Sequence, residues 1–433
     1  MDPDLSIVSL GKALRAGEFT SVELTRLCLQ RAEDSSNGAW RSLTAERALK
    51  MAERADRLFA EGHDLGPLHG IPAGIKDNIN MAGEVSLAGM DPLLPLRRAD
   101  ADASLVVRLE LAGAVIIGRT NMTELAYTAL GLSPRQTPLN PRDRERVPGG
   151  SSSGSAVAVA AGEVPFTLGT DTGGSVRIPA AYTGITGLKP GNGRLDLRGV
   201  FPLSSSLDTV GPMTRTARDA ELVFSMLDPA FTSEPRMGVP RILIPETVVL
   251  DDLDPEVAED FEQALKLFDD LNAVIDRRPL PLLQEVIEAR RYGSFAGWEA
   301  YRMYGELLRS GADQIEVAEA VLAYAERDLD DYQRLQERRS ALRRQLRQEL
   351  ADYDLILSPT VAGLPPMLSE VQTAAEQEER DSRGLRNTQL FNFFGLPVLA
   401  LPMGELTSLS IAAHEGKENL VLAAGKAFEE ARA

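Results

Sequence analysis

From Gly66 onward, short apolar runs alternate with longer stretches of helical periodicity. The runs are Ile71–Ile75, Ala114–Ile117, Phe166–Leu168, Arg241–Ile244, Leu355–Leu357 and Val398–Leu401. Short apolar runs that are separated by helical segments are typical of strands in an α/β domain with a mixed or mostly parallel sheet. The pattern therefore predicts an α/β fold.

The chain is expected to form one domain over residues 1–433, in three parts. Residues 1–62 carry apolar side chains at helix-like spacing and are expected to form leading helices. Residues 66–226 hold the most distinctive motifs, and residues 241–433 are expected to supply the rest of the sheet together with a helical insertion. Within that insertion, residues 330–350 carry charges of alternating sign on a helical period, which predicts the solvated face of a long helix.

The overall charge narrows the partners that this chain can bind. A formal net charge of -18 repels phosphate backbones and acidic membrane surfaces, so direct binding to nucleic acid is not expected. No uninterrupted apolar stretch approaches the length of a membrane span, and the acidic start of the chain does not resemble a signal peptide. The single cysteine, Cys28, allows no internal disulfide and fits a reducing compartment, so a cytoplasmic location is expected.

Few residues of this chain are suited to bind a metal ion. The three histidines, His63, His69 and His414, are scattered, and with one cysteine they match none of the ligand spacings of zinc sites. The G-x-x-x-x-G-K-[ST] loop that binds phosphate is missing from the sequence as well. We therefore expect neither a metal ion nor another cofactor.

The segment from Pro148 to Pro190 is rich in glycine and serine, but its composition is not that of a flexible linker. It contains the helix-forming run Ala156–Ala161 and the strand-like run Val164–Leu168. A second glycine-rich turn follows, with the sequence TDTGGS at residues 170–175. The segment is therefore expected to fold as a helix and a strand between two turns.

Two glycines stand directly before Ser175 in this second turn. A glycine pair lets the backbone bend sharply and direct consecutive N–H groups toward one point. A hydroxyl beside such donors is what an acyl-transfer site requires, because the donors stabilise the oxyanion that forms in the reaction. A glycine-rich turn without any ligand is the alternative interpretation of this segment taken alone.

A serine nucleophile requires a base, and no histidine lies near Ser175 in the sequence. A neutral lysine is an alternative base, and Lys76 directly follows the strand-like run Ile71–Ile75. Its pKa would have to fall by roughly three units from about 10.4, which corresponds to about 4 kcal/mol. Burial away from carboxylates has this effect, and the neighbouring Asp77 is expected to point to the opposite face of the strand.

Lysine is scarce in this chain, which has seven lysines and 39 arginines. A retained lysine is therefore expected where the group must lose its proton, since arginine cannot do so. Alone, the position of Lys76 does not distinguish a base from an ordinary lysine.

Three motifs, in order along the chain, resemble the amidase signature family. They are GIPAGIKDN (70–78), PGGSSSGS (148–155) and GTDTGGSVRIPA (169–180). The similarity continues in GAVIIGRTNMTELA (113–126), TGLKP (186–190), SSLDTVGPMTRTARDA (205–220), YDLILSPT (353–360) and FNFFGLPVLALPMG (391–404). The resemblance implies a single large α/β domain in which helices cover both faces of a twisted mixed sheet.

The resemblance also implies a catalytic triad and its surroundings. Ser175 matches the nucleophile, Ser151 the bridging serine and Lys76 the base, with a cis peptide bond between Gly150 and Ser151. Four backbone N–H groups are expected to hold the oxyanion: those of Thr172, Gly173, Gly174 and Ser175. Four further residues are expected to support the site: Ser152, Thr170, Asp171 and Arg177.

A stand-alone serine amidase that hydrolyses a small or peptide-like amide is the function that these features favour. A glutamine-hydrolysing subunit of a tRNA-dependent amidotransferase complex is an alternative within the family, although the acidic charge suits a transfer RNA complex poorly. A non-catalytic interaction protein on the same fold is the alternative from another class. The expected partner is a small-molecule amide, and a homodimer is left open.

Two short motifs indicate other serine enzymes, but their contexts do not fit. Gly150–Gly154 matches the G-x-S-x-G nucleophile elbow, yet a charged segment that ends in Pro148 precedes it where a strand is required. Ser9–Lys12 matches S-x-x-K within a leading helix, and the chain lacks the K-T-G partner motif.

Residues 285–325 and 360–385 are expected to shape the substrate pocket. Five aromatic residues either line this pocket or belong to the core: Tyr127, Tyr292, Trp298, Tyr301 and Tyr304.

Overall fold

The computed structural model describes residues 6–90, 97–234, 238–311 and 317–432. The strands within these ranges are β1 (Trp40–Leu43), β2 (Pro72–Lys76), β3 (Val115–Thr120), β4 (Phe166–Asp171), β5 (Thr186–Lys189), β6 (Thr209–Thr214), β7 (Arg241–Pro245), β8 (Val274–Arg278), β9 (Leu355–Pro359), β10 (Val398–Pro402) and β11 (Ser408–Ala413). They form one 11-stranded sheet in the order β1-β3-β2-β4-β6-β5-β10-β11-β9-β7-β8. Parallel pairs such as β2 and β4 occur beside antiparallel pairs such as β4 and β6, which confirms the predicted mixed sheet.

The six apolar runs in the sequence coincide with β2, β3, β4, β7, β9 and β10. Two strands lie where helices were expected. The prediction of leading helices over residues 1–62 is wrong at β1, because Trp40–Leu43 pairs antiparallel with β3. The helical insertion, expected over residues 254–350, is likewise interrupted by β8, which pairs in parallel with β7. Both are edge strands with half-buried or exposed side chains, so they lack the apolar run that marks a central strand.

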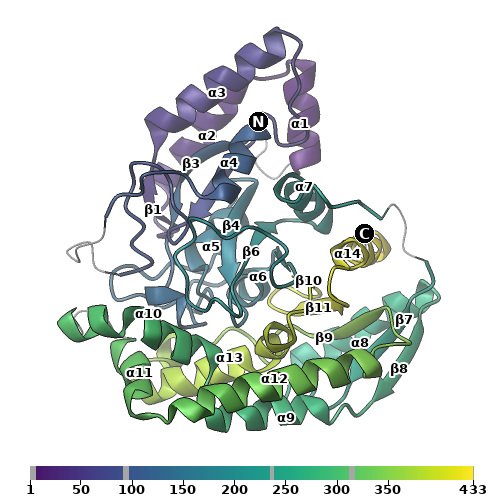
Figure 1. The fold of residues 1–433 in the computed structure, drawn as a ribbon. Helices are drawn as coiled ribbons and strands as arrows, with labels where there is room; N and C mark the ends of the chain where they lie inside the picture. Colours follow the sequence, from purple (N-terminus) through teal and green to yellow (C-terminus); the bar gives the residue numbers. More distant parts are fainter. Residues whose placement is uncertain (1–5, 91–96, 235–237, 312–316, 433) are drawn as a thin grey trace.

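The helices lie around this sheet (Figure 1). They are α1 (Ile7–Ala16), α2 (Ser21–Asp34), α3 (Ala45–Ala60), α4 (Ser104–Leu111), α5 (Ser153–Ala160), α6 (Arg177–Thr183), α7 (Ala217–Leu227), α8 (Pro255–Asp270), α9 (Leu282–Ala289), α10 (Phe295–Gly311), α11 (Ala318–Leu322), α12 (Leu329–Glu349), α13 (Ala374–Phe394) and α14 (Glu418–Arg432). Single 3₁₀ turns form η1 (Glu124–Ala126), η2 (Arg290–Tyr292), η4 (Ala323–Glu326) and η5 (Leu368–Glu370). Figure 1 shows α1–α3 at one end of the molecule and α9–α13 at the opposite end. Within the described ranges, none of the helices combines the length and apolarity needed to cross a membrane.

Capping residues define several helix ends. Thr20 begins α2 with a capping box, in which its side chain accepts from the Glu23 N–H and the Glu23 carboxylate accepts from the Thr20 N–H. Thr373 and Glu376 form the same arrangement at the start of α13. α6 ends at Gly184, whose φ of 65° lies in the left-handed region that glycine adopts at low cost.

Helices cover both faces of the sheet, as predicted. Leu399 of β10 pairs with Leu188 of β5, so the two side chains point to the same face. On that face α14 packs so closely that a Cβ on Gly425 would lie 2.3 Å from a Leu399 methyl. Gly187 points to the other face, where it lies against Ala180 of α6.

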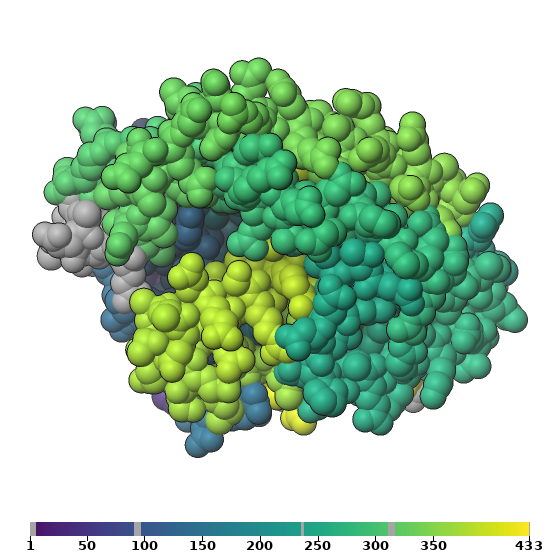
Figure 2. Space-filling model, turned by 90° about the horizontal axis from the view of Figure 1, so that it is seen from below, coloured from purple at the N-terminus to yellow at the C-terminus, as the bar shows by residue number. Residues whose placement is uncertain are grey.

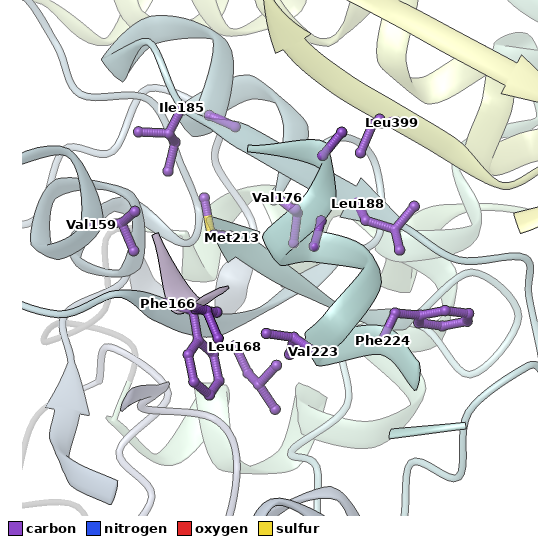
Figure 3. Packing of buried hydrophobic residues seen from close by; sticks show 14 of the residues in the cluster. Val159, Phe166, Leu168, Val176, Ile185, Leu188, Met213, Val223, Phe224 and Leu399 are labelled. Atoms are coloured by element: carbon purple, nitrogen blue, oxygen red, sulfur yellow. The ribbon is translucent and has the colours of Figure 1, made fainter. Parts of the chain in front are cut away.

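The central core fixes the strands and helices that carry the polar residues described below. Figure 3 shows its members from β4, β6, α5 and α7 packed together, including Phe166, Leu168, Met213, Val159 and Val223. Each of these five side chains is fully buried. Burial of each such side chain contributes about 1.5–3 kcal/mol relative to exposure. This packing holds the ends of the central strands in place against α5 and α6.

Candidate active site

The carboxyl ends of β2 and β4 lie side by side because the two strands pair in parallel. β2 ends at Lys76 and β4 ends at Asp171, so both residues reach the same edge of the sheet. The turn before α5 carries Ser151, and the turn before α6 carries Ser175. Since α5 and α6 contact each other, these elements bring the predicted residues together at one edge.

Lys76 is fully buried, with its amine directed at two hydroxyl groups. Its Nζ atom lies 2.7 Å from Ser151 Oγ and 2.8 Å from Thr170 Oγ1. Asn78 Nδ2 donates to the same Thr170 hydroxyl at 3.1 Å and thereby orients it. The amine therefore faces groups that can accept a hydrogen bond and also exchange a proton.

The charges around Lys76 leave its amine without an acidic partner among the described residues. Asp77 points away and forms an ion pair with Arg119, with 2.6 Å between Oδ1 and Nε. Burial lowers the pKa of Lys76 to about 7, although the charges of Asp171 and Asp208 act in the opposite direction. The neutral amine is thus accessible near pH 7, as a base requires.

Ser151 lies in a turn that backbone hydrogen bonds hold in place. The Gly150–Ser151 peptide bond is cis, as the resemblance implies. The Gly150 N–H donates to Ala129 O at 2.6 Å, and Ser151 O accepts from the Thr123 N–H at 3.2 Å. With Lys76 as donor, the Ser151 O–H itself has no acceptor within the described ranges. Its proton is therefore available to a further group.

The turn before Ser175 presents N–H groups that have no protein acceptor. In the described part of the chain, the N–H groups of Gly173, Gly174 and Ser175 donate to no other residue. Gly174 has a φ of 141°, and a Cβ there would lie 2.3 Å from Thr388 Oγ1. The turn therefore requires glycine, and the geometry that two glycines were expected to permit is present.

Ser175 itself is 6% exposed, and its hydroxyl makes no hydrogen bond with any residue that the structure describes. The two serine-bearing turns are joined through the Ser152 N–H, which donates to Ser175 O at 3.1 Å. The Ser152 hydroxyl is fully buried and donates to Thr170 O at 3.2 Å. Ser152 is the central serine of the G-x-S-x-G match, and its buried, occupied hydroxyl does not suit a nucleophile.

Asp171 and Arg177 form a buried ion pair behind the turn. Arg177 Nε and Nη2 each lie 3.0 Å from a different oxygen of the Asp171 carboxylate. The same carboxylate accepts from the Val176 N–H at 3.1 Å and from Asn392 Nδ2 at 2.7 Å. Burial alone raises the pKa of Asp171, but the charge and hydrogen bonds of Arg177 outweigh it and lower the pKa to about 2. The pair fixes the start of α6 relative to the end of β4.

Sequence reasoning missed the contribution of α13 to this site. Thr388 Oγ1 donates to Gly173 O at 2.6 Å, while Asn392 donates to Asp171. The only signal was Asn392 itself, a single amide within the aromatic run FNFF. Asp208, which precedes β6, was missed as well; it accepts from Thr172 Oγ1 at 2.6 Å.

The face shown in Figure 2 is hollowed between the green atoms of the α10–α12 region and the yellow-green atoms around α13. The two regions expected to shape the pocket, 285–325 and 360–385, lie on either side of this hollow, although residues 312–316 lie outside the described residues. Of the aromatic residues considered for its lining, Trp298 and Tyr304 are buried in the core. Tyr127, Tyr292 and Tyr301 are not fully buried.

Across the described ranges, His, Cys, Asp and Glu residues form no group of three or more that is placed to hold a metal ion. The polar groups near Lys76 are hydroxyls and amides, together with carboxylates that already accept several hydrogen bonds. This arrangement is suited to moving protons between hydroxyl groups.

Known proteins resemble this chain over nearly its whole length. The family model for Amidase matches residues 23–422. A 2-amino-5-chloromuconic acid deaminase from Comamonas testosteroni is 34% identical over 416 residues, covering 92% of this chain and 89% of that protein. A glutamyl-tRNA(Gln) amidotransferase subunit from Symbiobacterium thermophilum is 33% identical, covering 94% of this chain and 92% of that protein. A solved structure described as an amidase superposes with a TM-score of 0.89 at 32% identity, covering 99% of this chain and 100% of that one.

The fold and these matches define the class of protein: a hydrolase with an α/β fold that acts on carbon–nitrogen bonds. The chain belongs to the amidase signature family, over nearly its whole length.

Proposed function

We propose that this protein is a serine amidase that cleaves a linear amide through an acyl-enzyme on Ser175. Lys76 would act as the base and Ser151 as the proton shuttle between the other two. The observation that carries this proposal is the buried contact of 2.7 Å between Lys76 Nζ and Ser151 Oγ, at an amine whose pKa burial lowers to about 7. A lysine kept neutral beside a hydroxyl is the arrangement that can activate a serine without histidine.

In the first half of the reaction, neutral Lys76 takes a proton from Ser151, and Ser151 takes one from Ser175. Ser175 Oγ then forms a bond to the amide carbon, and the carbonyl electron pair moves to oxygen. When the intermediate collapses, the carbon–nitrogen bond breaks, Ser151 gives a proton to the nitrogen, and Lys76 returns its proton to Ser151 and is neutral again. This protonation matters because an unprotonated amide nitrogen leaves very poorly. Water then attacks the acyl-enzyme by the same route and releases the acid.

The N–H groups of Thr172, Gly173, Gly174 and Ser175 would hold the oxyanion. Support for this role comes from the N–H groups of the last three residues, which donate to no other described residue. Removal of one such donor typically costs about 3–4 kcal/mol of transition-state stabilisation. Asp171 and Arg177 would keep the turn in place, together with Ser152 and Thr170.

The expected substrate is a small-molecule amide. One observation supports the alternative within the family, a glutamine-hydrolysing role in a larger complex: the similarity to the glutamyl-tRNA(Gln) amidotransferase chain. The net charge of -18 favours the stand-alone amidase, since it opposes direct contact with a nucleic acid. The cytoplasmic location and the homodimer remain predictions from the sequence.

The proposal is tested by comparing Ser175→Ala with the wild-type protein on aliphatic, aryl and peptide amides and on glutamine, with release of ammonia or amine as the readout. We expect the substitution to lower kcat/KM at least about 10³-fold, because the covalent route is lost. Ser153→Ala is the matched control: it lies in the same glycine-rich region, and its buried hydroxyl has no hydrogen-bond partner among the described residues.

Equal rates for Ser175→Ala and wild type would contradict the nucleophile assignment. If no amide is cleaved by the wild-type protein, the non-catalytic interaction protein is favoured. Activity on glutamine alone, with partner proteins that co-purify from the native source, would identify the transamidation alternative.

A further inference from the structure

The loop that precedes β6 passes beside the turn of the proposed oxyanion hole, and a carboxylate joins the two. Asp208 accepts from Thr172 Oγ1 at 2.6 Å. It also accepts from the backbone N–H groups of Leu203 at 2.8 Å and Ser204 at 3.0 Å. Asp208 is 8% exposed, and these three donors converge on its carboxylate from two different segments. Asp208 therefore holds its own loop closed and ties that loop to Thr172.

Helix α10 fixes the same loop from the other side. Glu299 accepts from the hydroxyls of Ser204 at 2.8 Å, Ser205 at 3.1 Å and Ser206 at 2.5 Å, and from the Ser206 N–H at 3.0 Å. A fifth donor is the Tyr332 hydroxyl of α12, at 2.7 Å. The loop at Ser204–Ser206 is thus anchored on α10 through Glu299, and Tyr332 of α12 holds the Glu299 carboxylate in turn. Both helices border the hollow in Figure 2. Through Asp208, Thr172 is therefore tied to a loop that hydrogen bonds to Glu299 hold in place.

Thr172 is the first residue of the turn that leads to Ser175. Its hydroxyl is occupied by Asp208, so it is not available to a substrate. The anchored residue stands directly before the peptide groups whose N–H groups have no protein acceptor among the described residues. An oxyanion hole requires donors that are already aligned before the reaction, because reorientation during the reaction costs free energy.

We propose that Asp208 is a positioning residue of the reaction, whose ionised carboxylate holds Thr172 and thereby aligns the oxyanion turn. This inference rests on the proposed function of Ser175. It adds a residue outside the triad, on a loop that the sequence motifs did not connect with catalysis.

The charge of Asp208 also acts on the proposed base. Burial raises the pKa of Asp208 to about 6, although its three hydrogen bonds act in the opposite direction and the charge of Glu299 adds to the rise. The groups that face it are Lys76 of β2 and, on α10, Glu299 and Tyr304. Its negative charge opposes the lowering of the Lys76 pKa. Above about pH 7, Asp208 is ionised and Lys76 is neutral, which is the combination that the reaction needs.

Two substitutions separate positioning from charge. Asp208→Asn keeps an oxygen for the Leu203 and Ser204 N–H groups but places an amide where Thr172 donates, and it removes the charge. We expect kcat to fall about 10- to 100-fold with little change in KM, since the donors act on the transition state. Loss of the neighbouring negative charge should lower the pKa of Lys76 further. The acidic limb of the pH profile of kcat/KM should therefore move to lower pH.

Thr172→Val removes the hydroxyl but keeps the charge of Asp208. It should lower kcat by about tenfold without moving the acidic limb, and Thr172→Ser should restore most of the rate. A role limited to stability predicts a lower melting temperature in both variants with kcat unchanged per active site. That result, or a kcat of Asp208→Asn within about twofold of wild type, would overturn the proposal.

Active sites are counted with a fluorophosphonate that acylates activated serines, followed by mass spectrometry of the labelled peptide. If wild type is not labelled at Ser175, the proposed function fails, and the role of Asp208 fails with it. If wild type and Asp208→Asn are labelled at Ser175 at the same rate and turn over equally, the role of Asp208 alone is refuted. Slower labelling of Asp208→Asn, with unchanged folding by circular dichroism, supports it.

Discussion

Two lysines of this protein, Lys76 and Lys189, are alike in position, burial and pKa but differ in the groups that their amines contact. Both stand at the end of a strand, both are fully buried, and burial lowers the pKa of each to about 7. Lys76 directs its amine at the hydroxyls of Ser151 and Thr170, whereas Lys189 donates to the Pro190 carbonyl at 2.7 Å. A hydroxyl can give up a proton, and a carbonyl cannot. Burial makes a lysine able to exist without its proton, but only its neighbours determine whether it can act as a base in a reaction.

The largest effect that tests this comparison is expected for Lys76→Arg. Arginine keeps the positive charge and much of the length of the side chain, but it does not lose its proton in proteins. We expect kcat/KM for amides to fall at least about 10³-fold, because the base is lost. Steady-state amide hydrolysis at pH 8 measures the change.

Lys189→Met is the matched control, because it removes an equally buried amine from a position without a hydroxyl neighbour among its described hydrogen-bond partners. We expect its kcat/KM to stay within about tenfold of wild type once the fraction of folded protein is taken into account. A similar loss in both variants would mean that the two lysines do not differ in the way proposed. Retention of more than about a tenth of the wild-type rate in Lys76→Arg would exclude it as the base.

The same comparison explains what the sequence was able to predict about the site. Scarcity of lysine, with seven lysines and 39 arginines, favours Lys76 as a functional residue, yet the argument applies equally to Lys189. The order of the motifs in the chain separated them, since only Lys76 lies in the motif that matches the base. The neighbours of the Lys76 amine come from segments 75 and 94 residues away in the chain, so spacing alone did not reveal them.

For the fold, apolar runs located the strands that are buried on both sides. β1, β5, β6, β8 and β11 were not predicted, although together they make up a large part of the sheet. β1 and β8 are edge strands with polar or half-buried side chains. β5 (TGLK) and β6 (TVGPMT) are fully buried but carry glycine or proline, which are common in turns and depleted in strands. Their strand conformation depends on pairing with distant neighbours, and a local pattern does not contain that information.

A smaller loss of activity is expected for a variant that removes the hydroxyl of Ser151 and keeps the Lys76 amine. Ser151→Ala leaves Lys76 with the Thr170 hydroxyl and carbonyl as its remaining polar contacts, which brings its surroundings closer to those of Lys189. We expect amide hydrolysis to fall about 10²-fold or more, since the leaving nitrogen is no longer protonated. Esters should lose at least about tenfold less, because an alkoxide leaves with less need for a proton.

Matched amide and ester substrates with the same acyl group measure this difference. Ser155→Ala is the control, because its hydroxyl is also buried and also bonded to another hydroxyl, that of Thr120 at 2.6 Å. If the amide and the ester lose activity to the same extent in Ser151→Ala, a proton shuttle through this serine is not supported. Equal losses in Ser151→Ala and Ser155→Ala would indicate damage to packing instead.

The smallest expected effect concerns stability, and here the two lysines should behave alike. In the folded protein each amine has a pKa of about 7, compared with about 10.4 in an unfolded chain. Between these values the unfolded state binds the extra proton, so the free energy of unfolding rises with pH. Each lysine contributes at most about 1.4 kcal/mol per pH unit to this slope, and nothing further below about pH 7, where both states are protonated.

Lys76→Met and Lys189→Met should therefore each flatten the rise in the free energy of unfolding between about pH 7.5 and 9.5, by similar amounts. Urea unfolding followed by circular dichroism measures the slope, and other titrating groups cancel because all three proteins share them. The activity profile should differ: the acidic limb near pH 7 belongs to Lys76, so Lys189→Met should keep it. If only one variant flattens the stability slope, the other lysine is already charged in the folded state. If Lys189→Met also moves the acidic limb, that limb does not report on Lys76 alone.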